Sequence, residues 1–279
     1  MSIDIVETLS AFRARLPTLP VTTKPDRSLL SQADLEMETR IVRRLQFLDP
    51  TARILAEESG TGAWRPEGDE VPERMWVVDP IDGTAEFLRG ESREYCSALA
   101  LLEHGTPTWA LIVAPELGRD RTPLVIAAEA GGVTVNGAPA GFNSSLAASK
   151  QASVTRSMRT TGPLAFDATL RAAGYSLKTR ATSQVLDMVR TAIDLTEAAG
   201  DPIRFDVFHR LRQKLWDGVA GLLIGEMNGL LPPDGPSPFP LTARVLASDV
   251  PTFERSLMGR TEAVAVIERT DAAGSMKDR

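Results

Sequence analysis

The sequence predicts an α+β fold in its first half and an α/β fold in its second half. Residues 1–142 show two helical patterns and then apolar runs separated by short turns, as in an antiparallel meander. Residues 143–279 instead alternate between short apolar runs and helical patterns. A chain of 279 residues is long enough for two packed domains, which we expect at 1–142 and 143–279.

Two helices are predicted at the start of the chain from apolar residues at helical spacing. The stripes are Ile5, Leu9, Phe12 and Leu16 in the first helix, and Met37, Ile41, Leu45 and Leu48 in the second. Residues 16–34 contain three prolines and predict a loop or hairpin. The second helix should begin between Ser31 and Asp34 and end at Asp49-Pro50.

The strands of the first half are predicted from apolar runs bounded by turn residues. They are RILAEE (53–58), MWVVD (75–79), SALALLE (97–103), TWALIV (108–113), PLVIAAE (123–129) and VTVNG (133–137). His104-Gly105 and Gly131-Gly132 predict the turns of two hairpins, and Pro115 ends the first of them. Residues 60–74 are rich in turn residues and charge, and we expect a mobile surface loop there.

In the second half, strands and helices should alternate. We expect strands at ASVTRS (152–157), YSLKTRA (175–181) and RFDVF (204–208), and helices at 164–174, 184–193 and 216–229. Gly229 should end the last of these helices. Residues 232–240 predict a loop, and the polar tail from about residue 268 predicts disorder.

Composition excludes several classes of protein. A net charge of −6 argues against binding a nucleic-acid polymer, which requires clustered Lys and Arg. A single cysteine excludes an internal disulfide framework and is typical of a reducing compartment. The first residues do not resemble a signal peptide, and no run approaches the roughly 20 apolar residues of a membrane span. We therefore expect a cytoplasmic protein that does not bind membranes.

Most familiar catalytic groups are missing. The two histidines, His104 and His209, have no Ser or Cys partner at a suggestive spacing, which argues against a triad hydrolase. Cys96 has no second cysteine nearby and is most simply a strand residue that points inward. Neither the Rossmann nor the P-loop glycine pattern occurs, and the chain lacks the residues for a Cys/His zinc site.

Carboxylates, by contrast, stand at the ends of predicted elements. Asp34 stands at the start of the second helix, and Asp217 at the start of the helix from 216. Glu57 and Glu58 follow the apolar run RILA, and Asp79 and Asp82 follow MWVV. Each has a simpler explanation. Asp34 and Asp217 could be helix caps, the glutamates a solvated strand end, and 79–84 a plain turn; Glu86 is expected to be a surface charge.

Taken together, the acids predict a magnesium site. Mg²⁺ is held by a few carboxylates, water and substrate phosphate, and it offsets the repulsion between acids and a phosphate ester. Gly83 and Thr84 could then seat the phosphate with backbone N–H groups, and the Thr84 hydroxyl could orient a water. Because a bound metal ion can activate water near neutral pH, the shortage of histidine is no obstacle.

Three segments resemble the inositol monophosphatase superfamily of Mg²⁺-dependent, lithium-sensitive phosphatases. They are LAEESG (55–60), DPIDGTAEFL (79–88) and LWDGVAGLLIGEMNG (215–229), and KPDRSLLSQADLEME (24–38) resembles the early segment of the family. The likeness runs in the family's order from about Lys24 to about Gly229. It implies a layered α/β/α/β/α sandwich, a homodimer and two or three Mg²⁺ ions. The first domain would hold the metal and phosphate site, and the second would complete it and form the substrate pocket.

The resemblance also implies a role for individual residues. The metal ligands would be Glu58, Asp79, the Ile81 carbonyl, Asp82 and Asp217. Spacing alone leaves Glu57 and Glu58 equivalent; the second is taken from the family pattern. Asp34 and Thr84 would position and activate the attacking water, with Glu58 also in the catalytic set. Gly83 and Thr84 would bind phosphate, and Asp217 would contact the substrate as well as the metal.

The substrate is less sharply predicted. DGTAEF is most similar to the bacterial branch that hydrolyses 3′(2′),5′-bisphosphonucleotides, but Ala85 replaces that branch's lysine. The family's glycine before the helix at 183 is absent, and the segment from Ser183 to Asp217 is longer than usual. There, Arg210, Arg212 and Lys214 could contact a second phosphate or could form a solvated basic face.

We therefore expect a metal-dependent phosphomonoesterase that acts on a small polyol or sugar phosphate. The alternatives are a 3′(2′),5′-bisphosphate nucleotidase and a catalytically silent relative that acts as a binding protein.

Overall fold

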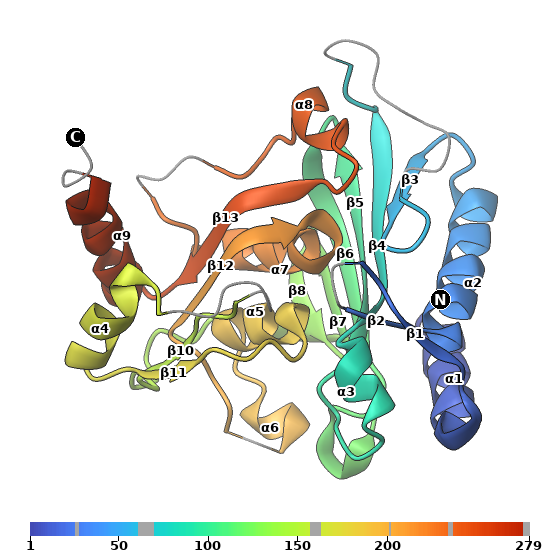
Figure 1. The fold of residues 1–279 in the computed structure, drawn as a ribbon, viewed down its shortest axis with the longest axis horizontal. Coiled ribbons are helices and arrows are strands. Elements are labelled where there is room, and N and C mark those ends of the chain that lie inside the picture. Colours follow the sequence, from blue (N-terminus) through green and yellow to red (C-terminus); the bar gives the residue numbers. More distant parts are fainter. Residues whose placement is uncertain (26–27, 61–69, 157–162, 201, 234–236, 276–279) are drawn as a thin grey trace.

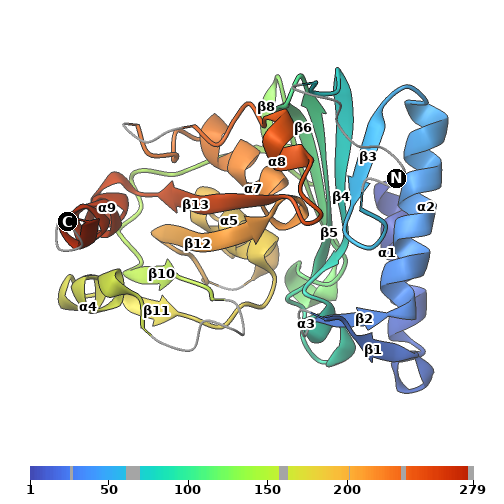
Figure 2. The same cartoon turned by 45° about the horizontal axis from the view of Figure 1, so that its top comes forward.

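The computed structural model describes residues 1–25, 28–60, 70–156, 163–200, 202–233 and 237–275. Five layers follow one another in it: two helices, a seven-stranded sheet, two helices, a four-stranded sheet and two further helices (Figures 1 and 2). The expected α/β/α/β/α sandwich is thus confirmed. None of the helices in the described ranges combines the length and the apolar character that a membrane crossing requires.

The first layer consists of α1 (Ser2–Arg13) and α2 (Gln32–Leu48), which cover the outer face of the large sheet. Their predicted stripes are buried as far as Phe12 and Leu45. Leu48 was expected on the buried stripe but is 56% exposed, because α2 ends there. The segment between the helices contains a short 3₁₀ turn (Leu16–Thr18) and a hairpin of β1 (Val21–Thr23) and β2 (Leu29–Ser31).

The large sheet has the order β3-β4-β5-β6-β7-β8-β9. Its strands are β3 (Arg53–Ala56), β4 (Arg74–Asp82), β5 (Cys96–Glu103), β6 (Thr106–Ala114), β7 (Leu124–Glu129), β8 (Gly132–Val135) and β9 (Ala138–Ala140). Only β3 and β4 are parallel within this sheet, so the predicted meander is confirmed. Cys96 is fully buried, as expected. A short helix, α3 (Thr84–Leu88), follows β4, and a 3₁₀ turn (Arg119–Arg121) precedes β7.

The small sheet has the order β11-β10-β12-β13. Its strands are β10 (Gln151–Ser153), β11 (Ser176–Lys178), β12 (Val207–Lys214) and β13 (Thr252–Gly259). The helices of this half of the chain are α4 (Ala165–Ala172), α5 (Gln184–Ala192), α6 (Thr196–Ala199), α7 (Leu215–Met227), α8 (Ala243–Leu246) and α9 (Thr261–Ser275). α5 and α7 lie between the two sheets, and α4 and α9 cover the outer face of the small one (Figure 2). The two halves share one apolar core through α5 and α7.

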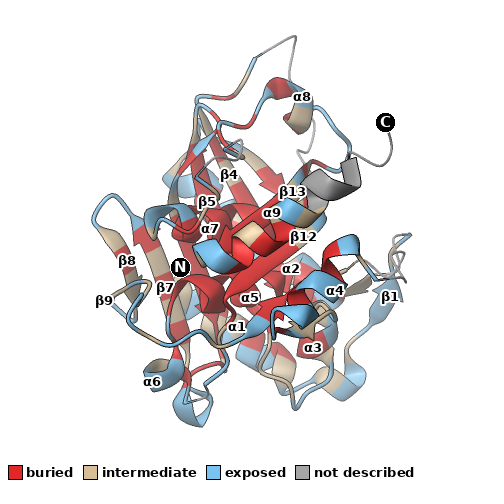
Figure 3. Ribbon diagram, turned by 90° about the vertical axis from the view of Figure 1, so that its left-hand side faces the viewer, coloured by how far each residue is buried: buried red, intermediate tan, exposed pale blue. Residues whose placement is uncertain are grey.

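α7 is buried between the sheets because it is apolar around its whole circumference (Figure 3). Gly221 and Gly225 allow close packing: a Cβ at either position would stand 2.7 Å from Met188 or Met258, respectively. This tight fit holds α7, whose first turn carries Asp217, against α5 and β13.

Three further expectations differ from the structure. The strand predicted at 204–208 instead runs from Val207 to Lys214, since pairing with β13 extends it through the basic run. The tail expected to be disordered from 268 is helical as far as Ser275, because buried residues such as Ile267 anchor α9. Glu86, expected on the surface, is buried and forms ion pairs with Arg89 and Arg180. Residues 61–69 and 234–236 of the predicted loops lie outside the described residues.

Candidate metal centre

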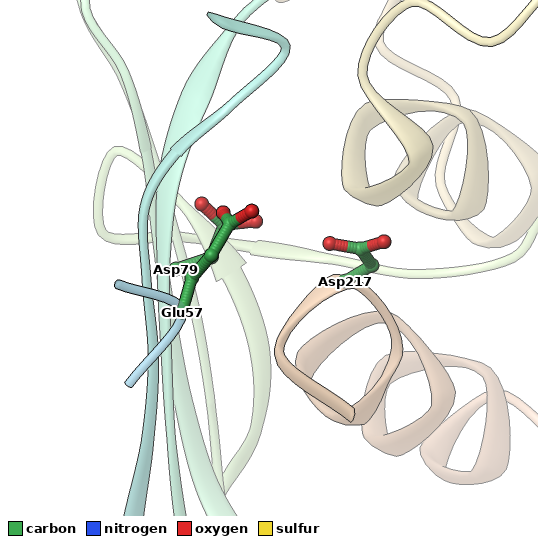
Figure 4. Close-up of side chains that lie close together, drawn as sticks. All are labelled: Glu57, Asp79 and Asp217. Atoms are coloured by element: carbon green, nitrogen blue, oxygen red, sulfur yellow. The ribbon is translucent and has the colours of Figure 1, made fainter. Parts of the chain in front are cut away.

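Three carboxylates from three separate elements meet between the large sheet and α7. Figure 4 shows Glu57 and Asp79 on the sheet side and Asp217 facing them from the first turn of α7. One oxygen of each carboxylate lies within 4.8 Å of the other two. Because β3 and β4 run parallel with Ala56 beside Val78, the next residues, Glu57 and Asp79, fall side by side.

The acids in and around the cluster raise one another's pKa. Burial raises the pKa of Asp79, and the carboxylates of Glu57, Asp82 and Asp217 raise it further. Neither carboxylate oxygen of Asp79 has a hydrogen-bond partner among the described residues. Burial and the nearby Asp217 raise the pKa of Asp82 to about 8, and burial and Glu57 raise the pKa of Asp217 to about 6. Buried carboxylates that repel one another in this way fit a divalent cation, which prefers oxygen ligands.

The start of α5 holds two of the acids in place. The Ser183 hydroxyl and the Val185 N–H donate to one oxygen of Asp82, at 2.5 and 2.7 Å. The Gln184 side chain donates to Asp217 at 2.7 Å. Ser183 is also the N-cap of α5. The sequence indicates a capping serine before this helix, but the pairing of Ser183 with Asp82, 101 residues away, and of Gln184 with Asp217, 33 residues away, could not be predicted from it.

Glu58 lies outside the three-carboxylate cluster, although the family resemblance pointed to it rather than to Glu57. The Lys24 ammonium donates to Glu58 at 2.6 Å and to Glu57 at 3.0 Å. Burial and the charge of Glu57 raise the pKa of Glu58 to about 7, against the opposing effect of Lys24. Burial would lower the pKa of Lys24, but the two glutamates raise it overall. Of the two glutamates, the one beside Asp79 is Glu57.

Asp34 and Thr84 are in direct contact. The Thr84 hydroxyl lies 2.9 Å from one oxygen of Asp34 and 3.1 Å from the Ile81 carbonyl. The other oxygen of Asp34 accepts hydrogen bonds from the Ser31 N–H and hydroxyl, at 2.7 and 2.6 Å. Ser31 is therefore the N-cap of α2, and Asp34 is the third residue of a capping box that also reaches Thr84. Burial raises the pKa of Asp34 in spite of these hydrogen bonds.

Gly83 forms the sharp turn between β4 and α3. Its φ is +92°, and a Cβ there would stand 2.6 Å from the Glu94 carbonyl oxygen. Only glycine fits this turn without strain. The turn brings Thr84 to Asp34, whereas the role of the Gly83 and Thr84 N–H groups in binding phosphate stays a prediction.

The basic run lies on β12 rather than on a uniformly solvated face. Arg212 is exposed, while Arg210 and Lys214 are partly buried. Lys214 approaches Glu57 at 3.6 Å. Arg210 lies near Asp82 and Asp217, whose charges raise its pKa, although burial lowers that pKa overall. A cavity of about 640 Å³ reaches Glu57 from outside and is also lined by Lys24, Glu58, Arg212, Lys214 and Trp216.

Comparison with known proteins shows the relationship of the chain. A model described as the inositol monophosphatase family matches residues 9–265. The chain is 30% identical over 225 residues to a protein named Nus factor SuhB from Xylella fastidiosa, covering 75% of this chain and 70% of that protein. It is 36% identical over 97 residues to the 3′(2′),5′-bisphosphate nucleotidase CysQ of Escherichia coli, covering 35% of this chain and 38% of that protein.

Solved structures share the fold. The extragenic suppressor protein suhB of Bartonella henselae matches with a TM-score of 0.69 at 20% identity, over 96% of this chain and 93% of that one. A dual specific IMPase/NADP phosphatase bound with D-inositol-1-phosphate matches with a TM-score of 0.67 at 17% identity, over 93% and 90%. At such identities these structures support the layered architecture alone.

Proposed function

The chain belongs to the inositol monophosphatase family, and we propose that it is a Mg²⁺-dependent phosphomonoesterase acting on a small polyol or sugar phosphate. The observation that carries the proposal is the cluster of Glu57, Asp79 and Asp217. Among the residues that the structure describes, neither buried carboxylate oxygen of Asp79 has a hydrogen-bond partner, which is expected of a metal ligand before the ion binds.

We assign the metal ligands from the geometry and the family pattern together. Asp79, Asp82 and Asp217 keep their expected roles, as does the carbonyl of Ile81. Glu57 takes the place first assigned to Glu58, because Glu57 is the glutamate in the cluster. Bound Mg²⁺ would offset the carboxylate charges, polarise the phosphate ester and make water more acidic. The number of ions, two or three, is carried from the family resemblance.

Asp34 and Thr84 are proposed to handle the attacking water. A Thr84 hydroxyl that donates to Asp34 leaves its own oxygen free to accept from a water molecule. The raised pKa of Asp34 makes this carboxylate a better proton acceptor than an exposed aspartate. The pair would therefore orient the water and take up its proton through the hydroxyl.

The proposal is tested by phosphate release with Mg²⁺, with and without Li⁺. The substrates would be inositol 1-phosphate, several hexose and pentose phosphates, histidinol phosphate, fructose 1,6-bisphosphate and adenosine 3′,5′-bisphosphate. A lithium-sensitive preference for a sugar or polyol phosphate would support the main proposal. No release from any of these esters would refute it and leave the silent binding relative, for which the similarity to a protein named as a Nus factor is the supporting observation.

Asp82→Asn tests the metal assignment directly. Asparagine keeps an oxygen for Ser183 and Val185 but lacks the charge, so we expect turnover to fall by at least about a hundredfold while the fold stays intact. Asp120→Asn is the matched control, since Asp120 is exposed, stands in a 3₁₀ turn and is not part of the carboxylate cluster. Near-normal turnover of Asp82→Asn with unchanged circular dichroism would sink the assignment.

The second candidate is a 3′(2′),5′-bisphosphate nucleotidase. It is favoured by the similarity to CysQ over 97 residues and by a partly buried arginine, Arg210, beside the acids. A preference for adenosine 3′,5′-bisphosphate in the same panel would promote it. A cytoplasmic location, a homodimer and the division at residue 142 stay predictions.

A further inference from the structure

The small sheet has an unpaired edge at β13. In the described part of the chain, β13 pairs with β12 on one side and with no strand on the other (Figure 2). The N–H of Gly259 turns away from β12 and donates to Leu230. In antiparallel pairing the backbone groups of alternate residues point to the same edge, so those of Leu257 and Arg255 turn away from β12 too. On that edge, the N–H of Leu257 has no hydrogen-bond partner among the described residues.

A cavity of about 900 Å³ lies along this edge. Residues of β13 line it together with Leu222 of α7, Val245 of α8, Glu268 of α9 and described residues of the segment between α7 and α8. Because α7 and α9 lie on opposite faces of the small sheet, the cavity reaches both faces at the edge of the strand (Figure 2). A strand added there would direct its alternate side chains toward α7 and toward α9.

The cavity has an apolar lining. Leu222, Phe253 and Leu257 are buried beneath it, and Leu231 and Val245 are partly exposed in its wall. Domains that bind a partner by strand addition use the same two features. The unpaired edge provides backbone hydrogen bonds, and the apolar groove beside it contacts alternate side chains of the partner.

The charges around the cavity are mostly negative. Glu226 of α7, Glu254 of β13 and Glu268 of α9 line it, and none of them forms an ion pair with another described residue. One cation, Arg255, stands against these three carboxylates. Charges on an edge strand also hinder pairing between sheet edges, but that role does not require a groove. A second copy of this chain would bring the same carboxylates to the edge, whereas lysine or arginine would be attracted to it.

We propose that the edge of β13 is a docking site for an extended, basic segment of a partner protein. The segment would add a strand to the small sheet, accept the N–H of Leu257, place apolar side chains in the groove and bring lysine or arginine to the glutamates. The cavity does not include the carboxylates of the metal centre, so the inference does not depend on the proposed function.

The test measures the binding of a fluorescein-labelled peptide by fluorescence anisotropy. The peptide alternates valine and lysine and is about eight residues long, within the usual length of a strand. We expect a Kd below about 100 μM. The same peptide with glutamate in place of lysine should bind at least about tenfold more weakly, because like charges across an interface repel each other.

Two N-methylated peptides test for strand addition. One is methylated on the backbone nitrogen of every valine, and the other on that of every lysine. Only alternate residues of an added strand donate to β13, so one of these peptides should bind at least about tenfold more weakly than the other. Hydrogen exchange should also show that the bound peptide protects the N–H of Leu257.

Two double variants locate the site. Glu254→Lys/Glu268→Lys reverses two charges at the groove and should weaken binding by at least about tenfold. Glu7→Lys/Glu129→Lys is the matched control, since both residues are exposed, lie in α1 and β7 and do not line the groove. This control should leave Kd within about twofold of the wild-type value.

Each outcome decides the proposal. Binding that only the groove variant weakens, with protection of the Leu257 N–H, supports the docking site. No binding of the valine–lysine peptide, equal binding of the two N-methylated peptides, or binding that the groove variant retains overturns it. A dimer of the free chain in analytical ultracentrifugation that the groove variant dissociates would assign the edge to a second copy and would also overturn it.

Discussion

Replacing Asp217 by asparagine should stabilise the protein in the absence of metal, although the same change should impair metal binding. Asp217 is buried next to Glu57, and its ionised form is disfavoured there. Asparagine has nearly the same shape, can still accept the hydrogen bond from Gln184, and carries no charge. The variant therefore removes a repulsion that Lys214 and Arg210 offset only in part and that a bound cation would relieve in the wild type.

The size of the effect follows from the pKa of Asp217. Folding raises it from 3.8 to about 6, a shift of roughly two units, which corresponds to about 3 kcal/mol at high pH. The sign is that of an acid with a raised pKa. Below about pH 4 Asp217 is protonated in both the folded and the unfolded protein, so it does not change the free energy of unfolding. As the pH rises, Asp217 ionises first in the unfolded protein, and the folded protein loses stability until about pH 6.

The assay is thermal and urea unfolding in EDTA at about pH 8 and about pH 4, for wild type, Asp217→Asn and the control Asp120→Asn. At the higher pH we expect Asp217→Asn to gain about 3 kcal/mol, or about 5–10 °C in Tm, and to gain little at the lower pH. Added Mg²⁺ should stabilise the wild type much more than the variant, because a ligand stabilises the state that binds it. Destabilisation of Asp217→Asn in EDTA at about pH 8, or a gain that does not depend on pH, would refute the reasoning.

Two further predictions concern the surroundings of the cluster. Lys24→Met should destabilise the metal-free protein by about 1–3 kcal/mol at about pH 8, because it leaves the buried Glu58 charge without its partner. The loss should be smaller at about pH 5, where Glu58 is protonated. Equal losses in urea unfolding at the two pH values would contradict this prediction. Gly83→Ala should lower the free energy of unfolding by at least about 2 kcal/mol, since φ at Gly83 is +92° and the new Cβ would clash with the Glu94 carbonyl. A Tm within about 1 °C of wild type would show that the turn tolerates a side chain.

The elements that depend on local pattern were predictable. The apolar stripe of α2, the hairpin of β5 and β6, and the largely apolar α7 are each encoded in a short stretch of chain and were found where expected. The acids at the ends of β3 and β4 and at the start of α7 were visible for the same reason, because a carboxylate directly after an apolar run stands out. The family motifs then indicated which protein fold brings such segments together.

What local pattern could not decide was which side chains meet. Glu57 and Glu58 are equivalent by spacing, and the parallel register of β3 with β4 places Glu57 beside Asp79 while Glu58 turns to Lys24. In an extended chain a shift of one residue reverses the direction of the side chain, so only strand pairing settles the choice.

Long-range contacts had the same effect on the second half. Pairing with β13 extends β12 through the basic run, and Arg210, for which the sequence left two explanations open, lies near Asp82 and Asp217. Ser183 and Gln184 reach Asp82 and Asp217 across gaps of 101 and 33 residues. The sequence alone thus determined the fold class and the family, and it pointed to the acids that meet at the cluster, except for the choice between Glu57 and Glu58. The tertiary structure decided which glutamate joins the cluster, what holds the acids, and where the arginine points, because these depend on the packing of segments that are distant in the chain.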